Sequence, residues 1–119
     1  MHERDLAAVA VAALLGDELV GRAMPLTGPE DLTVAAQVAI LGSVLGRELR
    51  YEELPPERAR AAMTAANPWV PEEAIASMLS YLAGTVGHPA PLTGEVERIL
   101  GRAPLPFAAW AADHAAAFA

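Results

Sequence analysis

The sequence contains no cysteine. This absence excludes a disulfide framework, a thiolate nucleophile and a zinc site built on cysteine, because each of them needs a sulfur atom. The three histidines, His2, His88 and His114, do not have the tight spacing of metal ligands. We therefore expect no metal site, and no cofactor is indicated by the residues themselves.

Lysine is also absent, and eight arginines stand against fifteen acidic residues, for a net charge of −7. Nucleic acids and anionic membrane surfaces are bound by clustered cations, whereas these arginines are scattered along the chain. We expect neither nucleic acid nor a membrane as a partner. Without lysine, a Tyr-x-x-x-Lys pair is excluded as well.

Aromatic residues are scarce, at 5% of the chain, although 54% of the residues are hydrophobic. Much of that hydrophobic fraction is alanine, so a core of Leu, Val, Ile and Ala is expected to be thin. A length of 119 residues predicts one domain, 1–119. Its small size favours a dimer or a partner protein.

Long hydrophobic runs are missing too. The run from Leu6 to Leu15 is too short to span a bilayer, and no cleavage signal for export is evident beside it. We therefore predict a cytoplasmic protein. No Gly-x-Gly-x-x-Gly loop follows a predicted strand, so no nucleotide-binding motif is expected in this chain.

Apolar residues at helical spacing dominate what is present. The predicted fold class is α+β, a mostly helical small domain with two or three short strands. Two strands are placed at Gly21–Leu26 and Leu49–Leu54. Helices are predicted at Asp5–Leu15, from the N-cap Thr33 to Gly46, at Glu57–Ala66, at Glu72–Ala83, from the cap Thr93 to Gly101, and at Phe107–Phe118.

The tetrapeptide Pro-Leu-Thr-Gly occurs twice, at Pro25–Gly28 and at Pro91–Gly94. Two copies of four residues do not indicate a repeat architecture. We interpret both copies as turns before a helix.

Candidate catalytic groups are few. The segment from His2 to Asp5, His-Glu-Arg-Asp, is the densest polar cluster and could hold an acid/base pair, but charge complementarity at a helix N-terminus is the favoured interpretation. Adjacent Glu52 and Glu53 would point to opposite faces of a strand and could not share a proton. The candidate acids and bases are His2, Asp5, Glu53 and His88.

An apolar or aromatic small molecule is the ligand that the remaining side chains would suit. Trp69 lies in a proline-bounded segment, where it could line a pocket or fill the edge of a core. Ordinary core packing is the favoured alternative. The residues expected around any such ligand are Tyr51, Met63, Trp69, Met78 and Tyr81.

Several stretches in one order carry a resemblance that covers nearly the whole chain. They are HERDLAAVA at His2–Ala10, LTGPEDLT at Leu26–Thr33, LGRELRYEE at Leu45–Glu53, and Gly101, Arg102, Pro104, Phe107, Trp110, Asp113 and His114 near the end. Together they resemble the C-terminal, substrate-lobe part of NmrA-like atypical short-chain dehydrogenase/reductases. That group includes NAD(P)H-binding, quinone-reductase-like enzymes.

The resemblance implies that the nucleotide-binding Rossmann half has no counterpart here, so no cofactor residue carries over. It also implies that Asp5 begins a helix which, in the family, packs on the Rossmann sheet. The apolar face of that helix then needs a cover, and a homodimer or a partner protein is expected on Leu6, Val9, Ala13 and Leu14. A substrate-side surface is implied around Tyr51, Trp69 and the helix that starts at Glu72.

Met1 stands where the family has an aliphatic residue, often valine. The resemblance therefore leaves open a natural short protein and a start inside a longer reading frame.

Three functions remain open from the sequence. The first is a stand-alone module, derived from a reductase substrate lobe, that binds a small molecule or a partner chain without binding nucleotide. The second is a cofactor-independent isomerase, cyclase or dehydratase in small-molecule (secondary) metabolism. The third is part of an NAD(P)H-dependent oxidoreductase.

Overall fold

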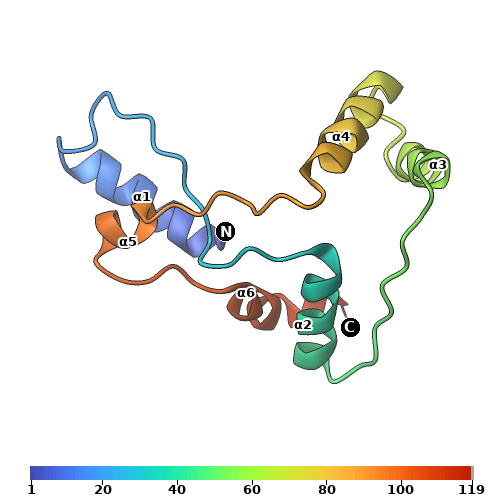
Figure 1. The fold of residues 1–119 in the computed structure, drawn as a ribbon. Coiled ribbons are helices and arrows are strands. Elements are labelled where there is room, and N and C mark those ends of the chain that lie inside the picture. Colours follow the sequence, from blue (N-terminus) through green and yellow to red (C-terminus); the bar gives the residue numbers. More distant parts are fainter. Residues whose placement is uncertain (119) are drawn as a thin grey trace. The chain divides into compact units, whose positions relative to one another are not determined.

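The computed structural model describes residues 1–118, and every regular element in that range is a helix (Figure 1). The all-helical structure agrees with the sequence, because apolar residues recur at helical spacing in most segments outside the turns. The elements are α1 (Glu3–Leu15), α2 (Val34–Leu45), α3 (Pro56–Ala66), α4 (Glu72–Thr85), α5 (Glu95–Leu100), α6 (Phe107–Asp113) and the 3-10 helix η1 (Ala115–Phe118).

The predicted α+β fold class is therefore wrong: no strand occurs in residues 1–118. The segments expected as strands, Gly21–Leu26 and Leu49–Leu54, are non-helical connections. A strand is stable only when its backbone pairs with a neighbouring strand. Here the carbonyl of Pro25 instead accepts a hydrogen bond from the Thr93 hydroxyl at 2.7 Å, so a side chain occupies the place of a strand partner.

The chain forms two compact units. One, the terminal unit, comprises Met1–Tyr51 and the chain from Pro91 onward, and the other, the hairpin unit, comprises Glu52–Ala90. The division into two units does not test the prediction of a single domain over 1–119, which stays a prediction. Within residues 1–118 no helix combines the length and the apolar composition needed to cross a bilayer.

In the terminal unit, α1 packs on α5, and α2 packs on α6. The buried apolar side chains are Val9, Val96 and Ala111, and two polar residues, His2 and Asp5, are buried with them. The thin core expected from the composition is thus confirmed, since the buried apolar side chains are few and none is aromatic. Buried polar groups add to it.

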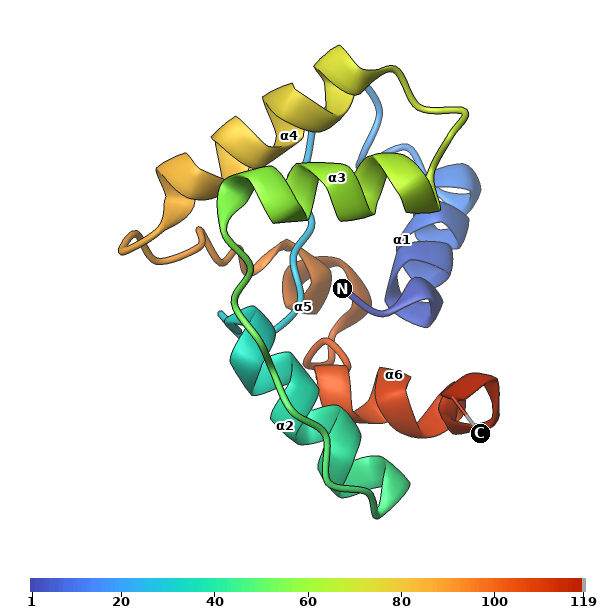
Figure 2. The ribbon, with the colours of Figure 1, turned by 90° about the vertical axis from the view of Figure 1, so that its right-hand side faces the viewer.

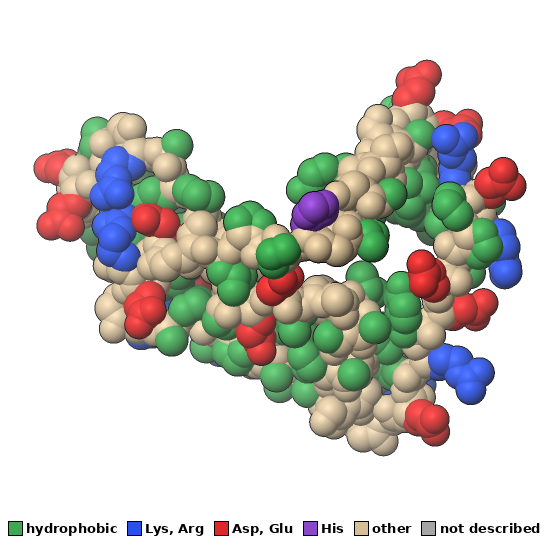
Figure 3. Space-filling view, in the orientation of Figure 1, with side chains coloured by type: hydrophobic (Ala, Val, Ile, Leu, Met, Phe, Trp, Pro, Cys, Tyr) green, Lys and Arg blue, Asp and Glu red, His purple; other side chains and the backbone are tan. Residues whose placement is uncertain are grey.

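The hairpin unit consists of α3 and α4, which lie alongside each other (Figure 2). Ile75 is its one buried side chain among residues 52–90. Its surface exposes hydrophobic side chains among acidic and basic ones (Figure 3). Pro56 stands in the first turn of α3, where its missing N–H costs no helical hydrogen bond.

Most of the predicted helix ends are confirmed, but the last helix, predicted over Phe107–Phe118, ends at Asp113 and is followed by the 3-10 helix η1. Thr33 caps α2, and its hydroxyl accepts from the backbone N–H of Ala36 at 3.2 Å. Gly46 and Gly101 end α2 and α5 in the left-handed conformation, with φ of 60° and 67°, which glycine adopts without a Cβ penalty. Thr93 was predicted wrongly as a cap, because Gly94 holds that position in α5.

The two Pro-Leu-Thr-Gly copies contact each other within the terminal unit. The backbone N–H of Thr93 donates to the Thr27 hydroxyl oxygen at 2.9 Å, and the Thr93 hydroxyl donates to the carbonyl of Pro25. Thr93 is therefore unavailable as a helix cap. The repeated tetrapeptide joins parts of the chain 66 residues apart.

Candidate functional site

The polar segment that opens α1 forms a clasp with the C-terminal part of the chain. Each of the residues His2, Glu3, Arg4 and Asp5 contacts a group between residues 102 and 114. We call this set, with Arg102, Asp113 and His114, the polar clasp. It lies entirely within the terminal unit.

His2 is buried, and both of its ring nitrogens have partners. Nδ1 accepts from the backbone N–H of Arg4 at 3.2 Å, so His2 caps α1. Nε2 lies 3.2 Å from Oδ2 of Asp113. Because Nδ1 accepts, this arrangement corresponds to the tautomer in which Nε2 carries the proton and donates to Asp113.

Asp5 is also buried, and both of its carboxylate oxygens face donors. Oδ2 accepts from the backbone N–H of Leu105 at 2.7 Å. Oδ1 lies 2.7 Å from Nη1 of Arg102 as an ion pair, although that contact does not have hydrogen-bond geometry. A buried carboxylate needs such compensation, since desolvation without a partner is costly.

The outer part of the clasp is more exposed. Nη2 of Arg4 lies 3.0 Å from Asp113, and Oε1 of Glu3 lies 3.2 Å from Nε2 of His114. The His114 ring stacks on Trp110 with centroids 4.8 Å apart. His114 follows the last residue of α6 and lies at the C-terminal end of that helix.

The His2–Asp113 pair has the geometry of a base and the carboxylate that orients it. A general base, however, needs a nitrogen that can accept a proton from substrate, and Nδ1 of His2 is already used as a cap. The geometry therefore favours a structural role for His2 and Asp5. In residues 1–118 no three His, Cys, Asp or Glu side chains are grouped so as to hold a metal ion.

The other two acid/base candidates are exposed. Glu53 lies in the connection before α3, and His88 lies in the turn after α4. Their catalytic roles stay predictions.

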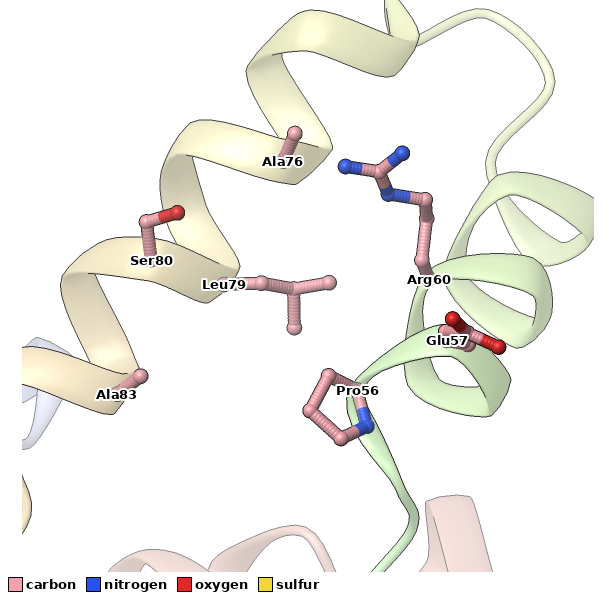
Figure 4. A pocket seen from close by; sticks show the side chains of 7 residues that line it. All are labelled: Pro56, Glu57, Arg60, Ala76, Leu79, Ser80 and Ala83. Carbon is pink, nitrogen blue, oxygen red and sulfur yellow. The ribbon is translucent and has the colours of Figure 1, made fainter.

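A second candidate site is an open pocket of about 530 Å³ between α3 and α4 (Figure 4). Leu79 projects from α4 into the space, and the Arg60 side chain extends from α3 towards Ala76. The guanidinium Nη1 of Arg60 lies 3.6 Å from Oε1 of Glu72, a distance too long for a hydrogen bond. The lining residues are Pro56, Glu57, Arg60, Ala76, Leu79, Ser80 and Ala83.

None of the five predicted ligand-binding residues lines this pocket. Met63 is half-buried on α3, Met78 is exposed on α4, and Trp69 and Tyr81 are 77% and 72% exposed. Tyr51 belongs to the terminal unit. Their role in ligand binding stays a prediction.

The pocket residues were not predicted, although the sequence contains a signal for them. Pro56 and Arg60 are separated by one helical turn, and Ala76, Leu79 and Ala83 follow i, i+3, i+7 spacing. Small side chains on one helix opposite a proline on the next leave space between them. The clasp partners Arg102 and Asp113 were missed as chemical partners because they lie about 100 residues away in sequence.

The apolar face predicted on α1 is partly different in the structure. Val9 is buried inside the terminal unit and Ala13 is half-buried, and a partner on this helix stays a prediction. Leu6 is half exposed, and Leu14 is 85% exposed. The exposed large apolar side chains of α1 are Leu6, Val11, Leu14 and Leu15, and we call the surface that carries them the open face of α1.

One ion pair shifts the pKa values of its members. The Glu95 carboxylate accepts two hydrogen bonds from Arg98, at 2.6 Å and 3.2 Å. This side-chain hydrogen bonding lowers the pKa of Glu95 and raises the pKa of Arg98. The pair lies at the surface of α5.

Known proteins similar to this chain are reductases. The (4-alkanoyl-5-oxo-2,5-dihydrofuran-3-yl)methyl phosphate reductase of Streptomyces griseus is 46% identical over 116 residues, which cover 98% of this chain. The NAD(P)H azoreductase of Xenophilus azovorans is 37% identical over 116 residues, 97% of this chain. The chain spans 40% of the length of each of these relatives. No family model matches the chain.

The resemblance to reductases is thereby confirmed, and it runs along almost the whole sequence. The narrower resemblance to NmrA-like proteins stays a prediction.

Proposed function

We propose that this chain forms the substrate-side part of an NAD(P)H-dependent reductase and works with a nucleotide-binding part supplied by other sequence. The observation that carries the proposal is the extent of the similarity. Nearly the whole chain is similar to two reductases, but it matches only 40% of the length of each of them. The name of the azoreductase states that it uses NAD(P)H.

The nucleotide site is assigned to the other part because this chain does not fit the cofactor. It has no glycine-rich loop of the kind that cradles a pyrophosphate at a helix N-terminus.

The open face of α1 supports a partner of this kind. Four large apolar side chains, Leu6, Val11, Leu14 and Leu15, lie exposed on one short helix. Large apolar side chains that remain exposed are candidates for burial in an interface. The polar clasp fixes the N-terminal end of α1 to the segment of residues 102–114, so the face is presented on a rigid support.

The proposed reaction is hydride transfer from NAD(P)H to a small organic molecule held partly by this chain. The name of the Streptomyces relative describes an alkanoyl-bearing phosphate ester as its substrate. We propose a substrate of comparable size for this chain, with an apolar portion.

The proposal is tested by replacing the matched part of the Streptomyces reductase with this chain. The chimera should oxidise NADPH in the presence of the reductase's substrate. A chimera that is folded by circular dichroism and binds NADPH, but reduces nothing, would contradict the proposal. In that chimera Leu14→Glu should weaken activity, whereas Val20→Glu, a matched change at an exposed residue outside α1, should not.

Titration of the isolated chain with NADPH is the complementary measurement. No binding is expected, and micromolar binding would show that a nucleotide site is present after all.

A further inference from the structure

We propose that the pocket between α3 and α4 binds a small amphiphile with a carboxylate or phosphate head and a short aliphatic tail. The pocket lies wholly in the hairpin unit, so the inference concerns this chain alone. It requires neither the nucleotide nor the open face of α1.

The space suits a short aliphatic tail. The pocket volume, about 530 Å³, falls in the range of small-molecule sites. Ala76 and Ala83 end at Cβ, so they leave the space between the helices unfilled. Leu79 and Pro56 provide larger apolar surfaces on opposite helices (Figure 4). Burying an aliphatic chain against such groups is favourable because it removes apolar area from water.

The charge at the opening suits an anionic head. Arg60 is the one cation of the lining, and its guanidinium carries five N–H donors in a planar fork that matches carboxylate and phosphate oxygens. Its contact with Glu72 is 3.6 Å long and joins side chains that are 51% and 66% exposed. A loose pair of this kind leaves most of the Arg60 donors to water.

Glu57 is the acidic group of the lining, and it limits where an anion can lie. Figure 4 shows its carboxylate on the α3 side of the opening, whereas Arg60 extends towards α4. An anion beside the Arg60 guanidinium would therefore lie on the side of the pocket towards α4, away from Glu57. Glu72 is the competitor that such an anion would displace.

The test is a calorimetric titration of the whole chain with hexyl phosphate and with hexanoate, and the tighter of the two names the head group. Binding of either supports the proposal. Inorganic phosphate and hexanol should each bind at least about tenfold more weakly, since each lacks one half of the contacts. Equal binding of hexyl phosphate and inorganic phosphate would overturn the assignment of the tail.

Variants locate the site. Arg60→Gln should weaken binding about tenfold, whereas Arg58→Gln, on the same helix but outside the lining, should leave it unchanged. Glu72→Gln should tighten binding by freeing Arg60, and Ala83→Leu should weaken it by filling the space. If Arg60→Gln and Arg58→Gln weakened binding equally, the assignment of the ligand to this pocket would be wrong. Circular dichroism of each variant shows that the helices are retained, and none of these readouts depends on reductase activity.

Discussion

The terminal unit and the hairpin unit reach compactness by different means. The terminal unit buries His2 and Asp5 beside its small apolar core and links residues 2 and 113 through a polar contact. The hairpin unit buries only Ile75 among residues 52–90, and the Arg60–Glu72 ion pair that joins its two helices is exposed to solvent. Alanine-rich helices bury little apolar area per residue. The comparison shows that long-range polar contacts can supplement a small apolar core, as they do in the terminal unit.

The largest effect is expected from removing the centre of the polar clasp. Asp5→Ala leaves the backbone N–H of Leu105 without its acceptor and Arg102 without its ion pair. The free energy of unfolding of the terminal unit should fall by about 3 kcal/mol. Hydrogen exchange should show lost protection in α1 and α5. Asp17→Ala, at an exposed aspartate, is the control, and an equal loss there would contradict a special role for Asp5.

The matching change in the hairpin unit is Ile75→Ala. Truncating its one buried side chain should reduce the stability of α3 and α4 by about 2 to 3 kcal/mol. Amide exchange should accelerate in residues 52–90 while the terminal unit keeps its protection. Leu82→Ala, at a half-exposed residue of the same helix, should have a small effect. If Ile75→Ala also weakened the polar clasp, the two units would not be independent.

A smaller effect is expected at the contact between the tetrapeptide copies. Thr93→Val removes the hydroxyl that donates to the carbonyl of Pro25 and should cost about 1 kcal/mol in urea unfolding. Thr27→Val removes the acceptor of the Thr93 backbone N–H. Because both residues belong to one contact, the double variant should cost less than the sum of the single variants. Full additivity would argue against a coupled contact.

The smallest effect concerns pH and the pair Glu95–Arg98. The pKa of Glu95 is lowered in the folded state, chiefly by its hydrogen bonds from Arg98. A lowered folded pKa stabilises the fold above the unfolded pKa, and this contribution disappears as the pH falls through the folded pKa. Carboxyl titration by NMR should show that Arg98→Gln moves the pKa of Glu95 up towards its ordinary value. Arg50→Gln should leave it unchanged.

Local signals in the sequence predicted most of the helices. Thr33, Gly46 and Gly101 act on backbone groups within a few residues of themselves, so their roles at helix ends could be predicted without knowledge of the fold. The predicted strands at Gly21–Leu26 and Leu49–Leu54 failed for the opposite reason. A strand depends on a partner elsewhere in the chain, and alternation of side chains does not show whether that partner exists.

The same limit applies to the candidate site. The sequence indicated a polar cluster at His2–Asp5, but it did not indicate that Arg102, Leu105 and Asp113 would meet it. Thr93 was assigned to the nearest helix because its true partners, Pro25 and Thr27, are distant in sequence. Burial of Val9 likewise depends on α5, which covers part of α1.

The contact between the tetrapeptide copies has a consequence for the order of folding. Thr27 and Thr93 are 66 residues apart, and His2 and Asp113 are 111 residues apart, so both contacts close long loops. Closing a long loop costs chain entropy before any contact compensates for it, and folding dominated by such contacts is slow. The helices α3 and α4 are neighbours in sequence and need no such closure. Pulse-labelled hydrogen exchange during refolding should therefore find α3 and α4 protected first, with the amide of Thr93 protected only when the long loop closes.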